Sequence, residues 1–190
     1  MRPSRRRLLT TALAASVLPL AGRSWAAAPK LATPVCDDGD EPTKAGTEGP
    51  FFKADAPMRQ DLAADGAGER LSVGGFVLDR QCRPLAGAAV QIWHADADGR
   101  YDNRGYRFRG WQRTDEAGRW WFSTIVPAVY PGRTRHYHMK VERPSGDMLT
   151  TQLFFPGEPG NARDWLYDSR LDLRMLDDAA GRMGRFDFIV

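Results

Sequence analysis

From residue 71 onward, short runs of strand-forming residues alternate with clusters of turn residues. Pairs such as Arg83-Pro84, Asp98-Gly99 and Pro131-Gly132 separate the runs, and such pairs are typical of turns. The expected strands are Leu71–Asp79, Ala88–His94, Arg119–Ile125, His136–Glu142, Met148–Phe155 and Arg185–Val190. Several short strands at this spacing predict an all-β domain over residues 71–190, built as a sandwich or a barrel.

Residues 29–70 show neither the two-residue period of a strand nor the 3.6-residue period of a helix. They are rich in Pro, Gly, Asp and Ala, which predicts an extended N-terminal arm with an anchor point at Thr47–Phe52. Ala162–Leu176 is the best candidate for a short helix. At 190 residues, the chain has room for one domain with a hydrophobic core.

The first 28 residues contain the parts of a secretory signal. The arginines Arg5–Arg7 precede the apolar stretch Leu8–Leu20, and the small residues Ala26–Ala28 close the segment. The arginine run also resembles a twin-arginine signal, with a general secretory signal as the alternative. The sequence therefore predicts export to the periplasm or the extracellular space. The apolar stretch is too short to span a bilayer comfortably, and no later stretch of the chain is expected to span one.

The net charge is different once these 28 residues are left out of the count. The whole chain has 27 basic and 24 acidic residues, but five of the arginines and none of the acids lie in residues 1–28. The remaining chain is slightly acidic, at about −2. No basic stripe with interleaved aromatic residues is left, which argues against nucleic acid as a partner.

The two cysteines are Cys36 in the arm and Cys82 near the start of the domain. An oxidising compartment permits a disulfide between them. The sequence leaves open whether their Cα atoms approach closely enough to form it. No C-x-x-C or zinc-ribbon pattern is present.

Two of the three histidines stand two residues apart, at His136 and His138, in an expected strand. Their side chains therefore project from the same face of the strand, with Tyr137 on the opposite face. Two imidazoles placed in this way predict half of a metal site, and an exposed polar strand face is the alternative. His94 stands alone and is expected to be a hydrogen-bonded structural histidine.

Histidine pairs occur in several kinds of metal site. Zinc usually adds a third histidine, a cysteine or a carboxylate. The iron(II) facial triad adds a carboxylate, and composition excludes neither site. The segment before the pair, Tyr130–Arg135, contains no carboxylate and offers a phenol across the Pro131-Gly132 turn. This turn could fold the phenol back toward the two histidines.

These residues resemble the intradiol ring-cleavage dioxygenases. The matching motifs are Gly99-Arg100-Tyr101, Thr124–Pro127, Tyr130–Arg133 and His136–His138, supported by Thr47–Phe52, Pro84–Ala88, Ile92-Trp93 and Thr151–Phe155. The resemblance covers nearly all of the chain after the leader and implies a single-domain β-sandwich of that family's type. Tyr137 and Arg135 replace the family's usual Ile and Pro without changing a metal ligand. The helical N-terminal domain of catechol 1,2-dioxygenases is missing, which leaves a homo-oligomer possible but undefined.

The resemblance implies a non-haem iron(III) ion held by Tyr101 and His136 as equatorial ligands and by Tyr130 and His138 as axial ligands. A free tyrosine has a pKa of about 10, so only a strong Lewis acid keeps two phenols ionised at neutral pH. A catechol dianion could replace a hydroxide and one tyrosinate without changing the net charge. The implied partners are therefore an aromatic diol and O2, and the implied product is a cis,cis-muconate-type diacid.

The same resemblance assigns roles in catalysis. Tyr130 would leave the iron and take up a substrate proton, and Gln152 would help to position the substrate. Arg133 would stabilise charge developing on the ring, because a guanidinium keeps its proton. Tyr106 is a rival to Tyr101, which is preferred because it directly follows the Gly-Arg pair.

The choice among catechol, hydroxyquinol and protocatechuate stays open at this point. Arg59 and Arg104 are candidates for binding a carboxylate on the substrate. Two hypotheses of another class also remain. One is an exported β-sandwich binding module without ring-cleavage activity, and the other is a zinc or copper protein that uses His136, His138 and a nearby carboxylate.

Overall fold

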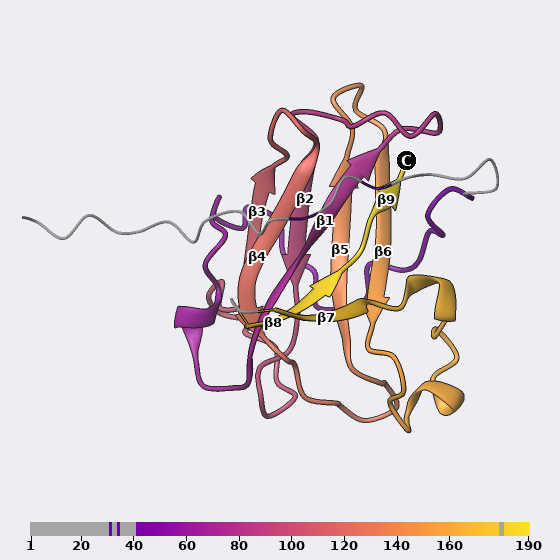
Figure 1. Ribbon diagram of the computed structural model, residues 1–190. Helices are drawn as coiled ribbons and strands as arrows, with labels where there is room; N and C mark the ends of the chain where they lie inside the picture. The colour runs from indigo at the N-terminus through magenta and orange to yellow at the C-terminus, as the bar shows by residue number, and fades with distance from the viewer. Residues whose placement is uncertain (1–30, 32–33, 35–40, 179–180) are drawn as a thin grey trace, which may run out of the picture.

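The computed structural model describes residues 31, 34, 41–178 and 181–190. The expected leader and Cys36 lie outside these residues, so the signal and the Cys36–Cys82 disulfide stay predictions. The described residues form nine strands in two sheets, joined by loops that contain three short 3-10 helices (Figure 1). The two sheets lie face to face, which confirms the expected all-β fold and makes it a sandwich. No helix in the described part of the chain is long and apolar enough to cross a membrane.

The first sheet has the strand order β4-β1-β8-β7, with β9 paired to the end of β1. Its strands are β1 (Arg70–Leu78), β4 (Arg119–Ile125), β7 (Arg174–Asp178), β8 (Gly181–Arg185) and β9 (Phe188–Ile189). β1 is antiparallel to β4 and parallel to β8 and β9. This sheet supplies one wall of the core.

The second sheet has the order β3-β2-β5-β6, and all of its neighbouring strands are antiparallel. Its strands are β2 (Ala89–Trp93), β3 (Arg109–Arg113), β5 (His136–Glu142) and β6 (Met148–Phe154). The register places His138 opposite Trp93 on β2 and opposite Gln152 on β6. Since residues in register project from the same face, these three side chains lie side by side.

The core lies between the two sheets and determines which face of β5 points outward. Tyr137, Met139 and Val141 are completely buried and pack in the core with residues of the first sheet such as Trp120 and Phe122. Since side chains alternate along a strand, the residues between them project from the outer face of the second sheet.

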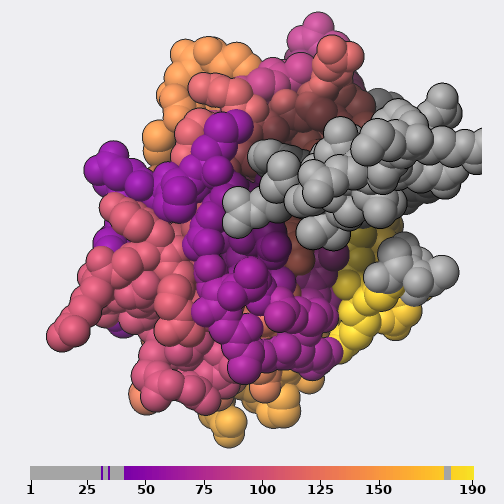
Figure 2. Space-filling view, turned by 90° about the vertical axis from the view of Figure 1, so that its left-hand side faces the viewer, coloured from indigo at the N-terminus to yellow at the C-terminus, as the bar shows by residue number. Residues whose placement is uncertain are grey.

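Residues 31, 34 and 41–69 are the described part of the arm before β1, and they include the 3-10 helix η1 (Ala63–Asp65). Backbone hydrogen bonds tie the arm to the sheets. Gly46 of the arm bonds to Thr150 on β6, and Arg59 bonds to Trp111 on β3. Further backbone hydrogen bonds join the arm to β4. Figure 2 shows the arm, in indigo to purple, lying across one face of the molecule. The arm therefore covers surface that the sheets alone would leave open.

Several sequence expectations need correction. β4 and β5 have the predicted bounds, but β3, β7 and β8 were not predicted. The sequences of β3 (RGWQR) and β8 (GRMGR) combine Gly with charged residues and lack the β-branched and aromatic runs that predict strands. Of the strand expected at Arg185–Val190, only Phe188–Ile189 forms β9, and Arg185 ends β8.

The short helix expected at Ala162–Leu176 is wrong. The segment contains the end of η2 (Asn161–Arg163), all of η3 (Ser169–Leu171) and the start of β7. The Asp164 side chain accepts a hydrogen bond from the backbone N–H of Leu166, and that of Asp168 accepts one from Arg170. Such local bonds favour turns over a continuous helix.

Candidate metal centre

The predicted histidine pair lies on the outer face of the second sheet. His136 and His138 project from this face of β5, and both are buried. Their ring centroids are 4.8 Å apart, and their Nε2 atoms approach to 3.2 Å. The two imidazoles therefore converge on one point, as the spacing in the sequence predicts.

Two tyrosines reach the same point from loops. The Tyr101 ring centroid lies 6.1 Å from that of His138 and 5.7 Å from that of Tyr130. The Tyr130 ring lies 5.6 Å from that of His136. The structure thus brings all four predicted ligands into one cluster, which we call the ligand cluster.

Glycines bring the two tyrosine loops into position. Gly99 has a φ of +78°, and a Cβ there would lie 2.5 Å from the carbonyl oxygen of Val129, just before Tyr130. Only glycine allows this approach without moving one of the loops. A tight turn then follows, in which the backbone N–H of Arg133 donates to the carbonyl oxygen of Tyr130 at 3.0 Å. This is the fold-back that the Pro131-Gly132 turn predicts.

Burial favours the neutral form of both histidines. Burial lowers the pKa of His136 to about 4, with a further contribution from the positive charge of Arg133. Burial, and then the neighbouring His136, hold the pKa of His138 well below its usual value. The Nδ1 atom of His136 lies 2.7 Å from the carbonyl oxygen of Thr134. A neutral ring donates its proton there, which leaves the lone pair of Nε2 directed toward the ligand cluster.

The hydroxyl group of Tyr101 is buried and has no hydrogen-bond partner among the described residues. Burial raises the pKa of Tyr101 well above its usual value, and the neighbouring Tyr130 raises it further. Without a cation this phenol stays protonated and unpaired, which is unfavourable. Two phenol oxygens and two imidazole nitrogens around one point form a donor set that fits iron(III).

The structure gives less support to a zinc or iron(II) site that uses carboxylate ligands. Within residues 41–178 and 181–190, no group of three or more His, Cys, Asp and Glu side chains is arranged to hold a metal ion. No carboxylate there completes a zinc site or an iron(II) facial triad with His136 and His138.

Arg133 and Gln152 border the ligand cluster, as the motif implies. One guanidinium nitrogen of Arg133, Nη1, donates to the Tyr130 hydroxyl at 3.2 Å, and Nη2 donates to Oε1 of Gln152 at 2.5 Å. Nε2 of Gln152 donates in turn to the carbonyl oxygen of Thr47 in the arm, at 3.2 Å. These bonds link the two predicted catalytic side chains to each other and to Tyr130.

Comparison with known proteins identifies the family. A family described as Dioxygenase matches residues 47–178. The chain is 31% identical over 162 residues to a hydroxyquinol 1,2-dioxygenase of Rhizobium sp. (strain MTP-10005), covering 69% of this chain and 55% of the relative. This chain belongs to the intradiol ring-cleavage dioxygenases. It is also 34% identical over 135 residues to the protocatechuate 3,4-dioxygenase beta chain of Burkholderia cepacia, covering 58% of this chain and 57% of that one.

Solved structures agree with this membership. The dioxygenase domain of a dioxygenase carbohydrate-binding protein fusion from Streptomyces sp. SirexAA-E has a TM-score of 0.76 and 46% identity, covering 79% of this chain and 98% of that one. An intradiol ring-cleavage dioxygenase from Tetranychus urticae, at 24% identity, shares the fold with a TM-score of 0.71 over 79% of this chain and 94% of its own. The chain spans about half the length of the curated relatives it matches. The family uses non-haem iron(III).

Three residues around the ligand cluster, Asp164, Arg109 and Trp93, were not predicted to contribute to it. Asp164 is buried and pairs with Arg133 at 2.9 Å. Burial opposes its ionisation, but N–H groups of Thr134 and Leu166 and the Arg133 guanidinium outweigh burial and lower the pKa of Asp164. A single Asp in a polar loop carried no signal in the sequence.

Arg109 is a buried cation behind Tyr101. Its Nη1 donates to the carbonyl oxygen of Phe51 at 2.6 Å, and its Nη2 to that of Asp102 at 3.2 Å. It joins the arm to the Tyr101 loop, because these carbonyl groups belong to the two segments. Trp93 is also buried and lies on the outer face, stacked on His138 with ring centroids 5.0 Å apart and planes within 7°.

The arm covers the ligand cluster. Phe51 stacks on Tyr101 with ring centroids 4.3 Å apart. Gly49 has a φ of +73°, and a Cβ there would lie 3.1 Å from Cε1 of His138. The anchor expected at Thr47–Phe52 therefore lies against two of the predicted ligands.

The other candidates are not members of the ligand cluster. Tyr106 is exposed, with the Lys53 ammonium 4.5 Å from its ring centre. His94 is hydrogen-bonded through both ring nitrogens, to Thr124 and to the Ala95 carbonyl, which confirms a structural histidine. Arg59 forms two 2.7 Å bonds to Asp65, so its guanidinium is already paired. Arg104 is exposed and lines a cavity of about 350 Å³ that also borders Tyr101.

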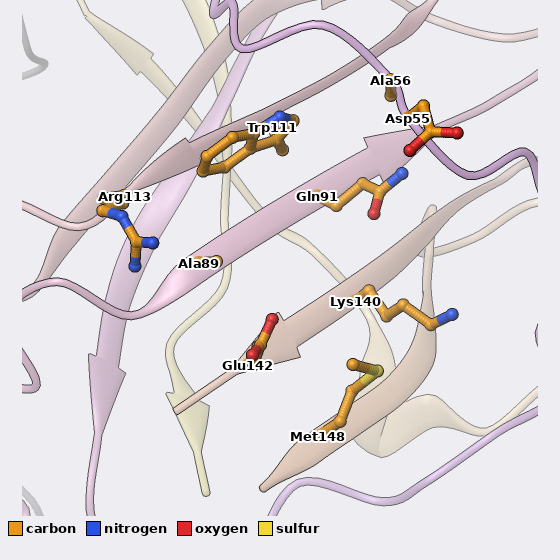
Figure 3. A pocket seen from close by; sticks show the side chains of 9 residues that line it. All are labelled: Asp55, Ala56, Ala89, Gln91, Trp111, Arg113, Lys140, Glu142 and Met148. Atoms are coloured by element: carbon orange, nitrogen blue, oxygen red, sulfur yellow. The ribbon is translucent and has the colours of Figure 1, made fainter. Parts of the chain in front are cut away.

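A second hollow of about 300 Å³ lies farther along the same outer face (Figure 3). Its lining is Asp55, Ala56, Ala89, Gln91, Trp111, Arg113, Lys140, Glu142 and Met148 and includes no predicted site residue. Lys140 pairs with Glu48 of the arm, and its ammonium lies 3.7 Å from the ring centre of Phe52. The arm therefore borders this hollow as well as the ligand cluster.

Proposed function

We propose that this chain is an iron(III) enzyme that cleaves a catechol-type ring between its two hydroxyl groups with O2, giving a cis,cis-muconate-type diacid. The observation that carries the proposal is the convergence of two buried imidazoles and two phenols on one point beside a guanidinium. Membership of the intradiol dioxygenase family supports it.

In this proposal Tyr101, Tyr130, His136 and His138 hold the iron. When bound, the iron supplies the Lewis acidity that keeps the phenols ionised and makes a bound catecholate reactive toward O2. Tyr130 is the ligand that would accept a substrate proton, as the resemblance to the family implies. Its phenol oxygen also receives a hydrogen bond from Arg133.

Arg133 remains charged throughout the reaction and lies beside the phenol that would move. Its fixed positive charge is suited to stabilising negative charge that develops on the ring. Gln152 is held between Arg133 and the Thr47 carbonyl and would position the substrate. Substrate positioning therefore depends on the arm as well as on the sheet.

We propose a monocyclic catechol as the substrate class, since relatives carry the names hydroxyquinol, catechol and chlorocatechol 1,2-dioxygenase. Charge balance supports a substrate that loses two protons, because such a dianion can replace one tyrosinate and a hydroxide. The exposed Arg104 would contact a carboxylate substituent if one is present.

We also propose that residues 1–28 direct export, through the twin-arginine pathway, to the periplasm or beyond. The support is the arginine run before a short apolar stretch and the closing alanines. Fusing residues 1–35 to a reporter that is active only outside the cytoplasm tests this. A reporter that stays inactive, or that still crosses after Arg5–Arg7 are changed to lysine, contradicts the twin-arginine proposal.

The decisive experiment is an optical spectrum of the iron-loaded protein, recorded before and after catechol is added without O2. Tyrosinate-bound iron(III) gives a visible charge-transfer band, and catechol binding should shift it to longer wavelength. Admitting O2 should then consume one O2 per catechol and release a diacid. A colourless protein with confirmed iron content would contradict the two-tyrosinate site.

A further inference from the structure

Resting on the proposed function, we infer that Asp164 is the positioning residue that aims Arg133 at Tyr130 and Gln152. Arg133 uses each of its three guanidinium nitrogens differently. Nε faces Asp164, Nη1 faces the Tyr130 hydroxyl, and Nη2 faces the Gln152 amide oxygen. Because a guanidinium is a rigid plane, holding its Nε edge sets the direction of the two outer nitrogens.

The Asp164 carboxylate is itself held on both oxygens. Oδ2 accepts the backbone N–H of Thr134 at 2.8 Å, and Oδ1 accepts that of Leu166 at 3.0 Å. Nε of Arg133 lies 2.9 Å from Oδ2 and 3.1 Å from Oδ1. The carboxylate therefore joins the turn before β5 to the loop after η2, and it has no freedom to rotate.

Burial makes this pair decisive for the position of Arg133. The Asp164 side chain is 1% exposed and that of Arg133 is 11% exposed. A buried ion pair tolerates the loss of one partner poorly, because the remaining charge is left without compensation. No other carboxylate is paired with Arg133 in the described part of the chain. Without Asp164, the guanidinium would be free to turn away from Tyr130.

Replacement by Asn tests the inference with almost no change in shape. Whichever carboxylate oxygen becomes the amide nitrogen, it faces a backbone N–H, so no orientation of the amide satisfies all the donors. We expect Asp164→Asn to lower kcat on catechol about 30- to 100-fold, the size expected for a displacement of roughly 1 Å. The iron content and the charge-transfer band should stay, because no ligand is changed.

Asn161→Ala is the matched control for loosening of the same loop. Asn161 is hydrogen-bonded to Thr134 at 2.7 Å and to the Phe155 carbonyl at 2.9 Å, and among the described residues no hydrogen bond or ion pair joins it to Arg133. We expect this variant to lose thermal stability while kcat stays within about threefold of the parent. Equal losses of kcat in Asn161→Ala and Asp164→Asn would overturn the positioning role.

A double-mutant cycle separates positioning from a general structural effect. If Asp164 acts through Arg133, adding Asp164→Asn to an Arg133→Gln chain should lower kcat by less than about threefold more. Losses that multiply would overturn the inference. If Asp164→Asn does not fold, Asp164→Glu keeps the charge, displaces the guanidinium and completes the same cycle.

A measurement on metal-free protein needs no activity. A ¹H–¹⁵N spectrum shows the Nε–H proton of Arg133, which is identified by the loss of its signal in Arg133→Lys. In the parent protein this proton should exchange slowly with water. In Asp164→Asn it should exchange at least tenfold faster. An unchanged exchange rate would overturn the inference. A parent enzyme that opens no catechol ring while this proton shows the expected change would refute the proposed function and leave the pairing intact.

Discussion

The two histidines on the outer face of β5 are buried like the residues on its inner face, but for different reasons. Tyr137, Met139 and Val141 face the first sheet and are buried by apolar side chains of the core. His136 and His138 face the other way, and the arm and two loops cover them instead. One face therefore supports the fold, and the other has room for polar groups that would be unfavourable in a core. Burial alone therefore does not separate core residues from site residues.

The largest expected effect comes from removing one phenol on the outer face. Tyr101→Phe should lower catechol cleavage more than about 1,000-fold, because two phenolates and a hydroxide together balance the trivalent charge. The metal-free protein should be as stable as the parent or slightly more stable, since the lost hydroxyl is buried and unpaired. Oxygen uptake and urea unfolding measure the two effects, and a clear loss of metal-free stability would contradict the contrast between the faces.

The opposite effect is expected on the inner face. Met139→Ala should destabilise the protein by about 2–5 kcal/mol, because a fully buried core side chain leaves a cavity. Activity per folded molecule should stay near that of the parent, measured below the unfolding transition. A specific loss of activity in the folded fraction would show that the core and the ligand cluster are coupled more tightly than this comparison implies.

The arm can be tested with two matched glycines. Gly49 and Gly87 have φ values of +73° and +76°, so alanine at either position costs about 1–2 kcal/mol of backbone strain. A Cβ at Gly49 would lie 3.1 Å from His138, and one at Gly87 would meet nothing within 4 Å. Gly49→Ala should therefore lower activity about tenfold, and Gly87→Ala should leave it unchanged. Equal activities in the two variants would show that the arm does not contribute to the site.

The smallest expected effect concerns pH and the arm. Hydrogen bonds from the side chains of Arg170 and Lys44 hold the pKa of Asp168 below its usual value. Because the pKa is lowered in the folded protein, this stabilisation is present above about pH 4, where the unfolded carboxyl is ionised, and is lost as pH falls below that. Its size should be roughly 1 kcal/mol after solvent screening, since the Lys44 side chain is half exposed.

Urea unfolding at pH 6 and pH 3 measures this difference. Asp168→Asn should reduce the change in stability between the two values, whereas Asp147→Asn on an exposed turn should not. An identical acid dependence in all three proteins would show that the Lys44–Asp168 pair does not stabilise the arm.

Much of the fold followed from local pattern. The bounds of β4 and β5 came directly from runs of strand-forming residues between turns. The bounds of β3 and β8 could not be predicted in this way. These polar segments form strands only because neighbouring strands supply hydrogen bonds and cover them. The helix expected at Ala162–Leu176 failed for a related reason, since Asp side chains capture the backbone N–H groups that a helix would use.

The sequence by itself determined the pairing of His136 and His138 on one face, because alternation along a strand is a local property of the backbone. It also determined the turn that brings Tyr130 back toward them. Only the tertiary structure decided that Asp164 fixes Arg133, that Arg109 joins the arm to the Tyr101 loop, and that the arm covers the ligand cluster. These contacts join residues far apart in the chain, and no short-range pattern in the sequence specifies which distant groups will meet.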